Sequence, residues 1–424
     1  MDFRANAVVI VGGGLSGLAA AVQLGRLGLP ALLFDDLTEV GGRAKTECRD
    51  GFYLNYGPHR LYERGAAAKT FRELGVPIES ATRGPNGGFA VWRGRRYTLP
   101  VGFCSLLTTG LLGASAKREI ARLLTSMSKV DIDALNDISI SRWLQVNVHD
   151  HDVIQLVLAF VRYATYCDDP ECQSASAAIE QLRLSMESPV LYIHHGWGSL
   201  VAGLQKAATS AGAEIIRGRV VAVNAAGEYA TSVTLADGSL VTARAVIVAT
   251  SPQSVRRLLS GGAAVEVPST PVRVAALDVA LRRLPRERAV FAVGIDEPWS
   301  FSADSVIARV APENGAVVHV AKYLRAGAAT ASDERQLERA LDVLQPGWRD
   351  LIVYRRFLPT LVVSHALVAA ESGGFAGRPN GQVPGLKNVF LAGDWIGPTG
   401  QLGDASVASG IEAARAIARM SCRR

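Results

Sequence analysis

The hydrophobic positions of the chain begin with a continuous apolar run, Val8 to Val11, which predicts a strand buried on both faces. Apolar residues then recur at helical spacing from Leu18 to Leu27, and Gly28 ends that helix. A second apolar run, Ala31 to Phe34, predicts another buried strand. The N-terminal segment therefore has the strand–helix–strand pattern of a parallel sheet.

Buried-strand runs of the same kind return at 245–250 and at 388–394, and a final helix is predicted over 404–418. The segments between them have other patterns, mostly helical over 100–183 and alternating strands and helices over 271–344. Two kinds of segment thus alternate along the chain, which favours two interleaved domains.

We therefore predict an α/β (α+β) fold, in which a Rossmann-like domain with a parallel sheet is interleaved with a domain of mixed sheet plus helices. The chain has 424 residues, of which 49% are hydrophobic and 20% charged, so it can bury a core in each of two domains. The first domain is predicted over 1–80, 190–268 and 385–424, and the second over 81–189 and 269–384.

A glycine motif, G-x-G-x-x-G, joins the first strand to the first helix, with Leu15 and Ser16 before its last glycine. Gly12 permits the tight turn, Gly14 removes a side chain that would block a pyrophosphate, and Gly17 lets the helix lie close to the strand. The N–H groups and partial positive charge of the helix N-terminus favour phosphate. This pattern predicts a dinucleotide site.

Two further features strengthen that prediction. Asp35 ends the second strand about 20 residues after the glycines, where a ribose hydroxyl needs an acceptor, and Asp36 is the alternative. The pair Gly41 and Gly42 then precedes Arg43, a fixed cation that could reach a bound phosphate.

Charge and composition exclude several functions. Lys and Arg total 45 against 39 acidic residues, which gives a mild formal charge of +6, and the chain has no basic block. This charge pattern argues against nucleic-acid binding. It still allows a weak attraction to anionic membranes. The five cysteines match no metal-binding spacing, so we expect no metal. The start lacks the features of a signal peptide, and the apolar stretch 101–113 is too short to span a membrane. We expect a cytoplasmic protein, with peripheral membrane contact as an open alternative.

Four motifs together resemble the superfamily of FAD-dependent amine oxidases, phytoene desaturases and protoporphyrinogen oxidases, with the phytoene dehydrogenase-like branch favoured. The motifs are GGGLSG, FDDLTEVGGR, FLAGDW and the small-residue helix SVASGIEAA, and HHGWGSL in the middle of the chain adds to them. The resemblance implies the fold predicted above and FAD as the cofactor.

The resemblance also implies roles for single residues around FAD. The glycine loop and Asp35 would bind the pyrophosphate and the adenosine ribose, and Val221 would pair with adenine through its backbone. The remaining cofactor positions implied by the motifs lie around the pyrophosphate, the ribityl chain and the flavin ring: Gly41, Gly42, Arg43, Gly57, Pro58, His59, Gly393, Asp394, Gln401, Ala405 and Ser406. The last two would begin the final helix, whose N-terminus would stabilise negative charge on reduced flavin.

The sequence departs from the amine oxidase branch at two places. That branch generally has a lysine that holds a water near flavin N5, whereas Arg273 or Val274 occupies the matching position. No second aromatic residue follows Trp395, so an aromatic pair that encloses amines is missing. The apolar segment between Tyr97 and Lys129 instead resembles the desaturase and protoporphyrinogen oxidase side.

The leading hypothesis is a dehydrogenase or desaturase that transfers a hydride from a small hydrophobic, isoprenoid-like molecule to flavin N5. An oxidase of an amine or cyclic nitrogen compound that releases hydrogen peroxide, a non-redox flavin isomerase and a flavin-free escort protein are the alternatives. Candidate catalytic residues are His59, Arg60 and Tyr62, and Trp197 and Trp395 are expected as pocket walls. Arg60 also suits a carboxylate or phosphate, and the oligomeric state is left open.

Overall fold

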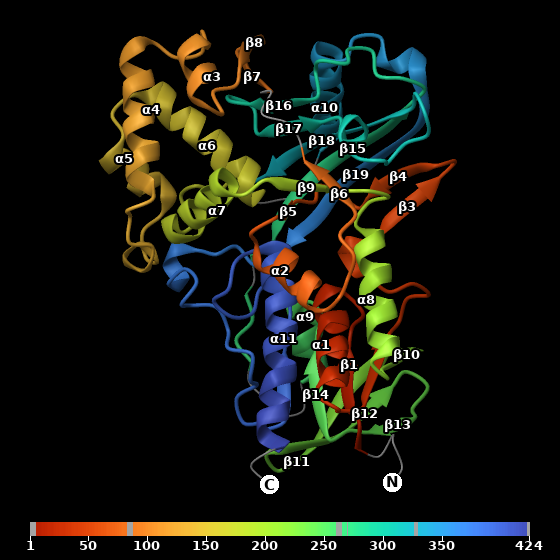
Figure 1. Cartoon of the computed structure of the whole chain (residues 1–424). Helices are drawn as coiled ribbons and strands as arrows, with labels where there is room; N and C mark the ends of the chain where they lie inside the picture. The colour runs from red at the N-terminus through yellow and green to blue at the C-terminus, as the bar shows by residue number, and fades with distance from the viewer. Residues whose placement is uncertain (1–5, 83–87, 260–264, 269, 326–329, 422–424) are drawn as a thin grey trace.

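The computed structural model describes residues 6–82, 88–259, 265–268, 270–325 and 330–421. The lower part of the molecule in Figure 1 contains a five-stranded sheet in the order β10-β2-β1-β14-β20, in which every neighbouring pair is parallel. The strands are β1 (Val8–Val11), β2 (Ala31–Asp35), β10 (Glu214–Arg217), β14 (Ala245–Val248) and β20 (Val389–Leu391). The predicted parallel sheet of distant segments is therefore confirmed.

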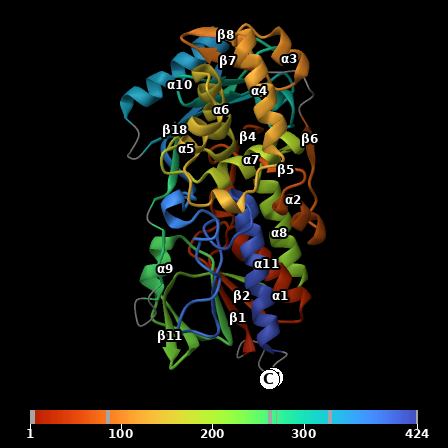
Figure 2. The same cartoon turned by 90° about the vertical axis from the view of Figure 1, so that its left-hand side faces the viewer.

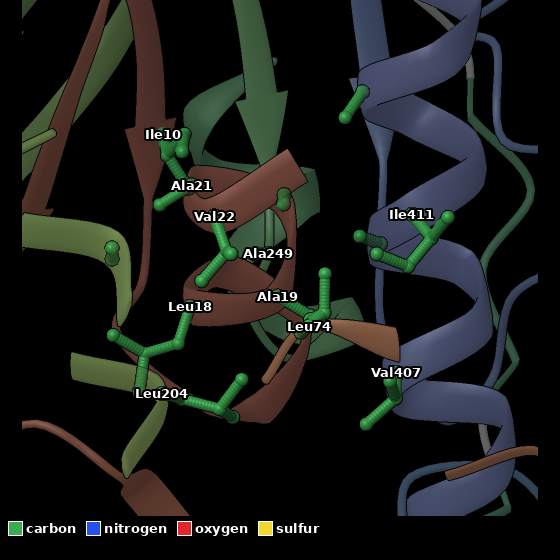
Figure 3. Packing of buried hydrophobic residues seen from close by; sticks show 14 of the residues in the cluster. Ile10, Leu18, Ala19, Ala21, Val22, Leu74, Leu204, Ala249, Val407 and Ile411 are labelled. Carbon is green, nitrogen blue, oxygen red and sulfur yellow. The ribbon is translucent and has the colours of Figure 1, made fainter. Parts of the chain in front are cut away.

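Three helices cover one face of this sheet: α1 (Leu15–Arg26), α8 (Gly198–Ser210) and α11 (Leu402–Ser421). Figure 3 shows Leu18 and Val22 of α1 among these elements, with Leu204 from α8 and Ile411 from α11 nearby. Burying each large side chain stabilises the fold by about 1.5–3 kcal/mol. The last helix begins at Leu402 rather than at 404, which corrects the predicted boundary.

The second large sheet has seven strands in the order β19-β15-β18-β17-β16-β7-β8. Its strands are β7 (Phe89–Trp92), β8 (Arg95–Thr98), β15 (Val272–Leu281), β16 (Phe291–Gly294), β17 (Trp299–Ser302), β18 (Ala316–Leu324) and β19 (Ile352–Ser364). Most neighbours are antiparallel, and β16 with β7 is a parallel pair. The predicted mixed sheet is therefore present, and α10 (Ala331–Leu344) packs against β15 and β18.

A block of helices follows β8 (Figure 1) and packs with residues of β7 and β16 in one hydrophobic cluster. Its helices are α3 (Phe103–Thr108), α4 (Ala114–Met127), α5 (Ile140–Asn147), α6 (His151–Thr165) and α7 (Ala175–Glu187). Figure 2 shows α3 at the same end of the molecule as β7 and β8. The helical pattern predicted over 100–183 is confirmed.

Smaller elements lie outside the two large sheets and the helical block. They are β3 (Thr46–Arg49), β4 (Phe52–Asn55), β5 (Leu61–Tyr62), α2 (Ala66–Glu73), β6 (Ser80–Thr82), β9 (Val190–Ile193), β11 (Val220–Ala226), β12 (Tyr229–Leu235), β13 (Leu240–Thr242) and α9 (Pro252–Leu258). Single 3₁₀ turns are η2 (Gly42–Ala44), η3 (Asp133–Leu135), η4 (Asp304–Val306), η5 (Trp348–Leu351) and η6 (Ala370–Ser372). The chain thus crosses repeatedly between the two large sheets, and the domain limits given above stay a prediction.

No helix among the described residues is both long and apolar enough to cross a membrane.

Candidate functional site

The loop between β1 and α1 contains three glycines with different surroundings. Gly12 has φ +107°, and a Cβ there would lie 2.5 Å from the carbonyl oxygen of Ala249. A Cβ at Gly17 would lie 1.9 Å from the carbonyl oxygen of Gly12, so close packing of α1 on β1 requires glycine. A Cβ at Gly14 would instead meet no protein atom within 4 Å. Gly14 therefore keeps space free beside the N-terminus of α1, which fits a dinucleotide phosphate.

A cavity of about 260 Å³ opens at the carboxyl ends of β1 and β2. In an open parallel sheet, this edge is where dinucleotides bind. Four predicted cofactor positions line the cavity, namely Gly12, Asp35, Asp36 and Val221. Leu15 and Ser16 open α1 beside it, in a first turn whose N–H groups have no acceptor within the helix.

Asp35 also shapes the loop that it faces. Its Oδ2 accepts the N–H of Gly13 at 2.6 Å, and its Oδ1 accepts the N–H of Leu37 at 2.9 Å. Each carboxylate oxygen has a second lone pair, so both remain able to accept from a ribose hydroxyl. Asp35 thereby joins the glycine loop to the turn that follows β2.

Arg43 and Asp394 form a two-point ion pair between the two ends of the chain. The guanidinium nitrogens of Arg43 lie 3.0 and 2.9 Å from the two carboxylate oxygens of Asp394. Gly41 and Gly42, with φ of +118° and +55°, turn the chain into this position. The backbone N–H of His365 donates to Asp394 at 2.9 Å. Although burial alone would raise the pKa of Asp394, Arg43 and His365 hold it well below its usual range.

The residues predicted at the start of the last helix are engaged in protein contacts. Gln401 donates its side-chain amide to the carbonyl oxygen of Ala177 at 2.9 Å. The N–H of Ala405 bonds to the carbonyl oxygen of Gln401, and the hydroxyl of Ser406 donates to that of Leu402. Ala405 closes the first turn of the helix that begins at Leu402, and Ser406 follows it, so both lie near the N-terminus of this helix; their role toward flavin stays a prediction.

Trp395 was predicted as a pocket wall, but it belongs to the core. Its side chain is fully buried among strand residues of the parallel sheet, and its indole N–H donates to the carbonyl oxygen of Thr250. The backbone of Gly393, with φ +158°, lies against the Trp395 ring. A Cβ at this position would be 2.8 Å from the indole nitrogen. Gly393 and Trp395 therefore anchor the end of β20.

A second, smaller cavity of about 40 Å³ lies between the helical block and the mixed sheet. Gly57, Pro58 and His59 line it. The ring Nδ1 of His59 lies 2.9 Å from the carbonyl oxygen of Gly57, and its ring packs on Trp197. Burial lowers the pKa of His59 to about 4, so this imidazole is neutral at neutral pH.

Arg60 lines the same cavity, with its guanidinium carbon 3.4 Å from the ring centre of Tyr163 and 4.4 Å from that of Tyr166. It also donates to the carbonyl oxygen of Tyr163. Within the described residues, no carboxylate forms an ion pair with Arg60, and the hydroxyls of Tyr62 and Tyr166 are buried without hydrogen-bond partners. Burial raises the pKa of Tyr62 to about 12, so Tyr62 is protonated at neutral pH.

The register of β15 distinguishes the two residues matched to the lysine of amine oxidases. Val274 packs with Tyr166 and Tyr323 on the side of the cavity. Side chains alternate along a strand, and Ala275 packs in the cluster beneath α10. Arg273 shares that opposite face, so Val274 is the residue on the cavity side.

A buried charged cluster beside the cavity was not found by sequence analysis. Asp278 of β15 lies 2.7 Å from Nδ1 of His319 and 2.7 Å from a guanidinium nitrogen of Arg356. Arg356 also donates to Glu47 at 2.7 Å, and His319 lines the cavity. The sequence feature that could have indicated this cluster is a single acidic residue, Asp278, inside the otherwise apolar run VAALDVAL.

His194 and His195 lie outside this cavity and line a separate surface groove near α8. Nδ1 of His194 accepts the backbone N–H of Arg309, and the ring of His195 packs edge-on against Tyr53. These contacts give both histidines a packing role at the start of α8.

Comparisons with known proteins agree with this geometry. Residues 15–276 match the family model described as flavin containing amine oxidoreductase. An L-amino acid oxidase of Cerastes cerastes is 42% identical over 74 residues, 17% of this chain and 14% of that protein. A coproporphyrinogen III oxidase of Propionibacterium freudenreichii subsp. freudenreichii is 36% identical over 106 residues, 24% of this chain and 20% of that protein. The aligned stretches thus span a fifth or less of these relatives.

A structure of putrescine oxidase bound to putrescine superposes with a TM-score of 0.71 at 16% identity, covering 99% of each chain. At this identity the likeness shows the fold, which extends over both large sheets.

Proposed function

Because the chain belongs to the flavin containing amine oxidoreductases, and is therefore an FAD-dependent oxidoreductase, we propose that it oxidises a substrate whose anionic group is bound by Arg60. One observation supports this substrate class above others. A half-buried guanidinium that packs against two tyrosine rings lines the cavity without a carboxylate partner among the described residues.

A compensating charge stabilises a cation that is partly removed from water. Contacts with the faces of Tyr163 and Tyr166 offset part of the cost of removing Arg60 from water, by roughly 0.5–2 kcal/mol each. An ionic hydrogen bond adds about 1.5–3 kcal/mol. A carboxylate, sulfonate or phosphate of the substrate would supply that bond in two-point geometry.

The residues of the cofactor site fit FAD. The free space at Gly14 would take the pyrophosphate, and the cavity at Asp35 and Asp36 would take the adenosine ribose. Val221, at the edge of that cavity, is proposed to pair with adenine, and the pair of Arg43 and Asp394 would face the pyrophosphate and ribityl chain. Bound flavin supplies the hydride acceptor, N5.

The chain's own residues bind and orient the substrate. Arg60 fixes the anionic end, and the surrounding aromatic rings of Tyr163, Tyr166 and Phe291 exclude water. His59 is held by Gly57 and stays neutral, so it adds no second cation to the cavity.

Two matched probes test the proposal. Benzoate and its uncharged amide, benzamide, are titrated into the holoenzyme, and binding is measured from the change in flavin absorbance. We expect benzoate to bind and benzamide to bind far more weakly. The variant Arg60→Gln should lose benzoate affinity by about 10- to 100-fold. The control Arg96→Gln, at an exposed position of β8, should bind as the wild type does.

Turnover is tested with phenylalanine and phenethylamine, which differ by one carboxylate. We expect anaerobic bleaching of the flavin to be faster with the carboxylated member, and peroxide formation in air would mark an oxidase. Equal binding of benzoate and benzamide, or unchanged benzoate binding by Arg60→Gln, would overturn the assignment.

A second candidate is the small hydrophobic, isoprenoid-like substrate, taken up with peripheral membrane contact. The observation that favours it is the exposed apolar surface at the start of α3, where Phe103 is 77% exposed beside Val101 and Leu107. Such side chains are costly to leave in water unless an apolar partner covers them.

A further inference from the structure

We propose that His319, oriented by Asp278, takes up the proton that leaves the substrate during oxidation. This inference rests on the proposed function, because it requires a substrate in the cavity lined by Arg60. The substrate loses a hydride from carbon to oxidised flavin and a proton from the neighbouring nitrogen, oxygen or carbon to Nε2 of His319. A double bond forms in the substrate, the flavin is reduced, and the imidazole becomes an imidazolium.

The position of His319 follows from strand register. It lies on β18 opposite Asp278 of β15 and Ser302 of β17, and it lines the cavity together with Arg60 and His59. On the same face of β15, Val274 and Ala276 are apolar, so Asp278 is the ionisable neighbour that this strand contributes.

Asp278 fixes which nitrogen of His319 can react. Its carboxylate is fully buried and held ionised by Arg356, whose side-chain nitrogens lie 3.1 and 2.7 Å away. An ionised carboxylate only accepts hydrogen bonds. The Nδ1–H of His319, 2.7 Å away, therefore donates a hydrogen bond to Asp278. Nε2 is left as the nitrogen that can accept a proton.

Asp304 completes the arrangement on the other side of the ring. Its Oδ2 lies 3.7 Å from Nε2, beyond hydrogen-bond range. Its Oδ1 is buried without a hydrogen-bond partner within the described residues. A proton arriving at Nε2 would therefore create an imidazolium between two carboxylates, Asp278 and Asp304.

The charges around His319 favour this protonation. The groups that face it are Asp278 from β15, Asp304 from η4, Arg356 from β19 and His59 from the loop after β4. Glu47 partly neutralises Arg356. Burial alone would lower the pKa of His319, but the two aspartates raise it, whereas burial holds the pKa of His59 at about 4. When the environment shifts the pKa values of two neighbouring groups in opposite directions, the two groups often serve as the acid and the base of an active site.

The experiment compares His319→Asn with the wild-type holoenzyme. The asparagine amide can still donate to Asp278, but it has no nitrogen that titrates. Histidine rings labelled with ¹³C are followed by NMR over pH, and the resonance missing in His319→Asn identifies His319. We expect its pKa to lie above that of an ordinary histidine and to fall in Asp304→Asn, which removes one of the flanking charges.

The same variants are followed by anaerobic flavin bleaching with phenylalanine. We expect a wild-type rate that rises with pH through the His319 pKa, and a loss on the order of 100-fold in His319→Asn with no remaining inflection. His194→Asn, which changes a histidine outside the cavity, should keep the wild-type profile. Should His319→Asn fold poorly, the shift of the inflection in Asp304→Asn carries the test.

The outcomes separate the two proposals. A wild-type rate and pH profile in His319→Asn, or an inflection unmoved in Asp304→Asn, overturns the role of His319. Absence of bleaching in the wild type instead counts against the substrate assignment, while the NMR titration still tests the environment of His319.

Discussion

Arg43 and Asp394 are 351 positions apart in the sequence, yet their side chains meet in an ion pair with N–O distances of 2.9 and 3.0 Å. Asp394 is almost fully buried, and Arg43 is about two-fifths exposed. The pair joins the turn after β2 to the end of β20, and so connects the first and last parts of the nucleotide-binding sheet.

Removing one partner should weaken both stability and cofactor retention. Arg43→Gln leaves the Asp394 carboxylate buried with fewer donors, and we expect a loss of about 2–3 kcal/mol, below the range for fully buried pairs because Arg43 is partly exposed. Thermal unfolding and the flavin-to-protein absorbance ratio measure the two effects. Arg415→Gln, in an exposed pair with Glu412, is the control and should change neither.

Two glycines of the same loop should respond differently to valine. At Gly14 the new side chain points into open space, so Gly14→Val should keep the melting temperature of the apoprotein and lose FAD. At Gly17 it would collide with the carbonyl oxygen of Gly12, so Gly17→Val should destabilise the fold itself. Full flavin content in Gly14→Val would refute the assignment of this loop.

Asp404 should make the protein less stable as the pH rises. Its carboxylate accepts the N–H of Ala67 at 2.6 Å, and burial raises its pKa to about 6 from the usual 3.8. The folded state therefore binds more protons than the unfolded state between those pH values, and stability falls over that range by about 2–3 kcal/mol.

Asp404→Asn keeps an oxygen acceptor for Ala67 but cannot ionise. We expect the variant to match the wild type near pH 4 and to exceed its melting temperature at pH 7.5. Glu412→Gln, an exposed change on the same helix, should leave the difference between the two pH values unaltered. A wild-type pH dependence in Asp404→Asn would contradict the role given to burial.

Charged substitution at the start of α3 tests the proposed membrane contact. Phe103→Glu should reduce binding to vesicles of anionic phospholipid in a sedimentation assay, because it removes apolar area and adds repulsion. Flavin content should stay the same. Leu240→Glu, at a 68% exposed position on β13, is the matched control. Equal vesicle binding by Phe103→Glu and the wild type would rule out this surface.

The parts of the fold that depend on local pattern were predictable from the sequence. The runs Val8 to Val11 and Ala31 to Phe34 are apolar because both faces of these strands are covered, and Gly12 and Gly17 mark a turn with no room for a side chain at either position. These features need no knowledge of distant residues.

The second cavity depends on strand register between distant segments, which local pattern does not encode. Asp278 and His319 meet because β15 and β18 pair in one particular alignment. The burial of Trp395 in the core, where the sequence predicts a pocket wall, has a related reason: the turn at Gly393 directs the indole back to Thr250 instead of outward. The last helix begins two residues before the predicted position, at Leu402, whose φ of +55° is a conformation that leucine seldom adopts.

The strand order β10-β2-β1-β14-β20 has a consequence for synthesis of the chain. In the chain, β20 and α11 follow both segments that form the mixed sheet, so they emerge from the ribosome after those segments. Until then, β14 has an unpaired edge, and the apolar surface of α1 that α11 covers is open to water. The ion pair between Arg43 and Asp394 cannot form before β20 has emerged, so we expect FAD to be loaded only after that point.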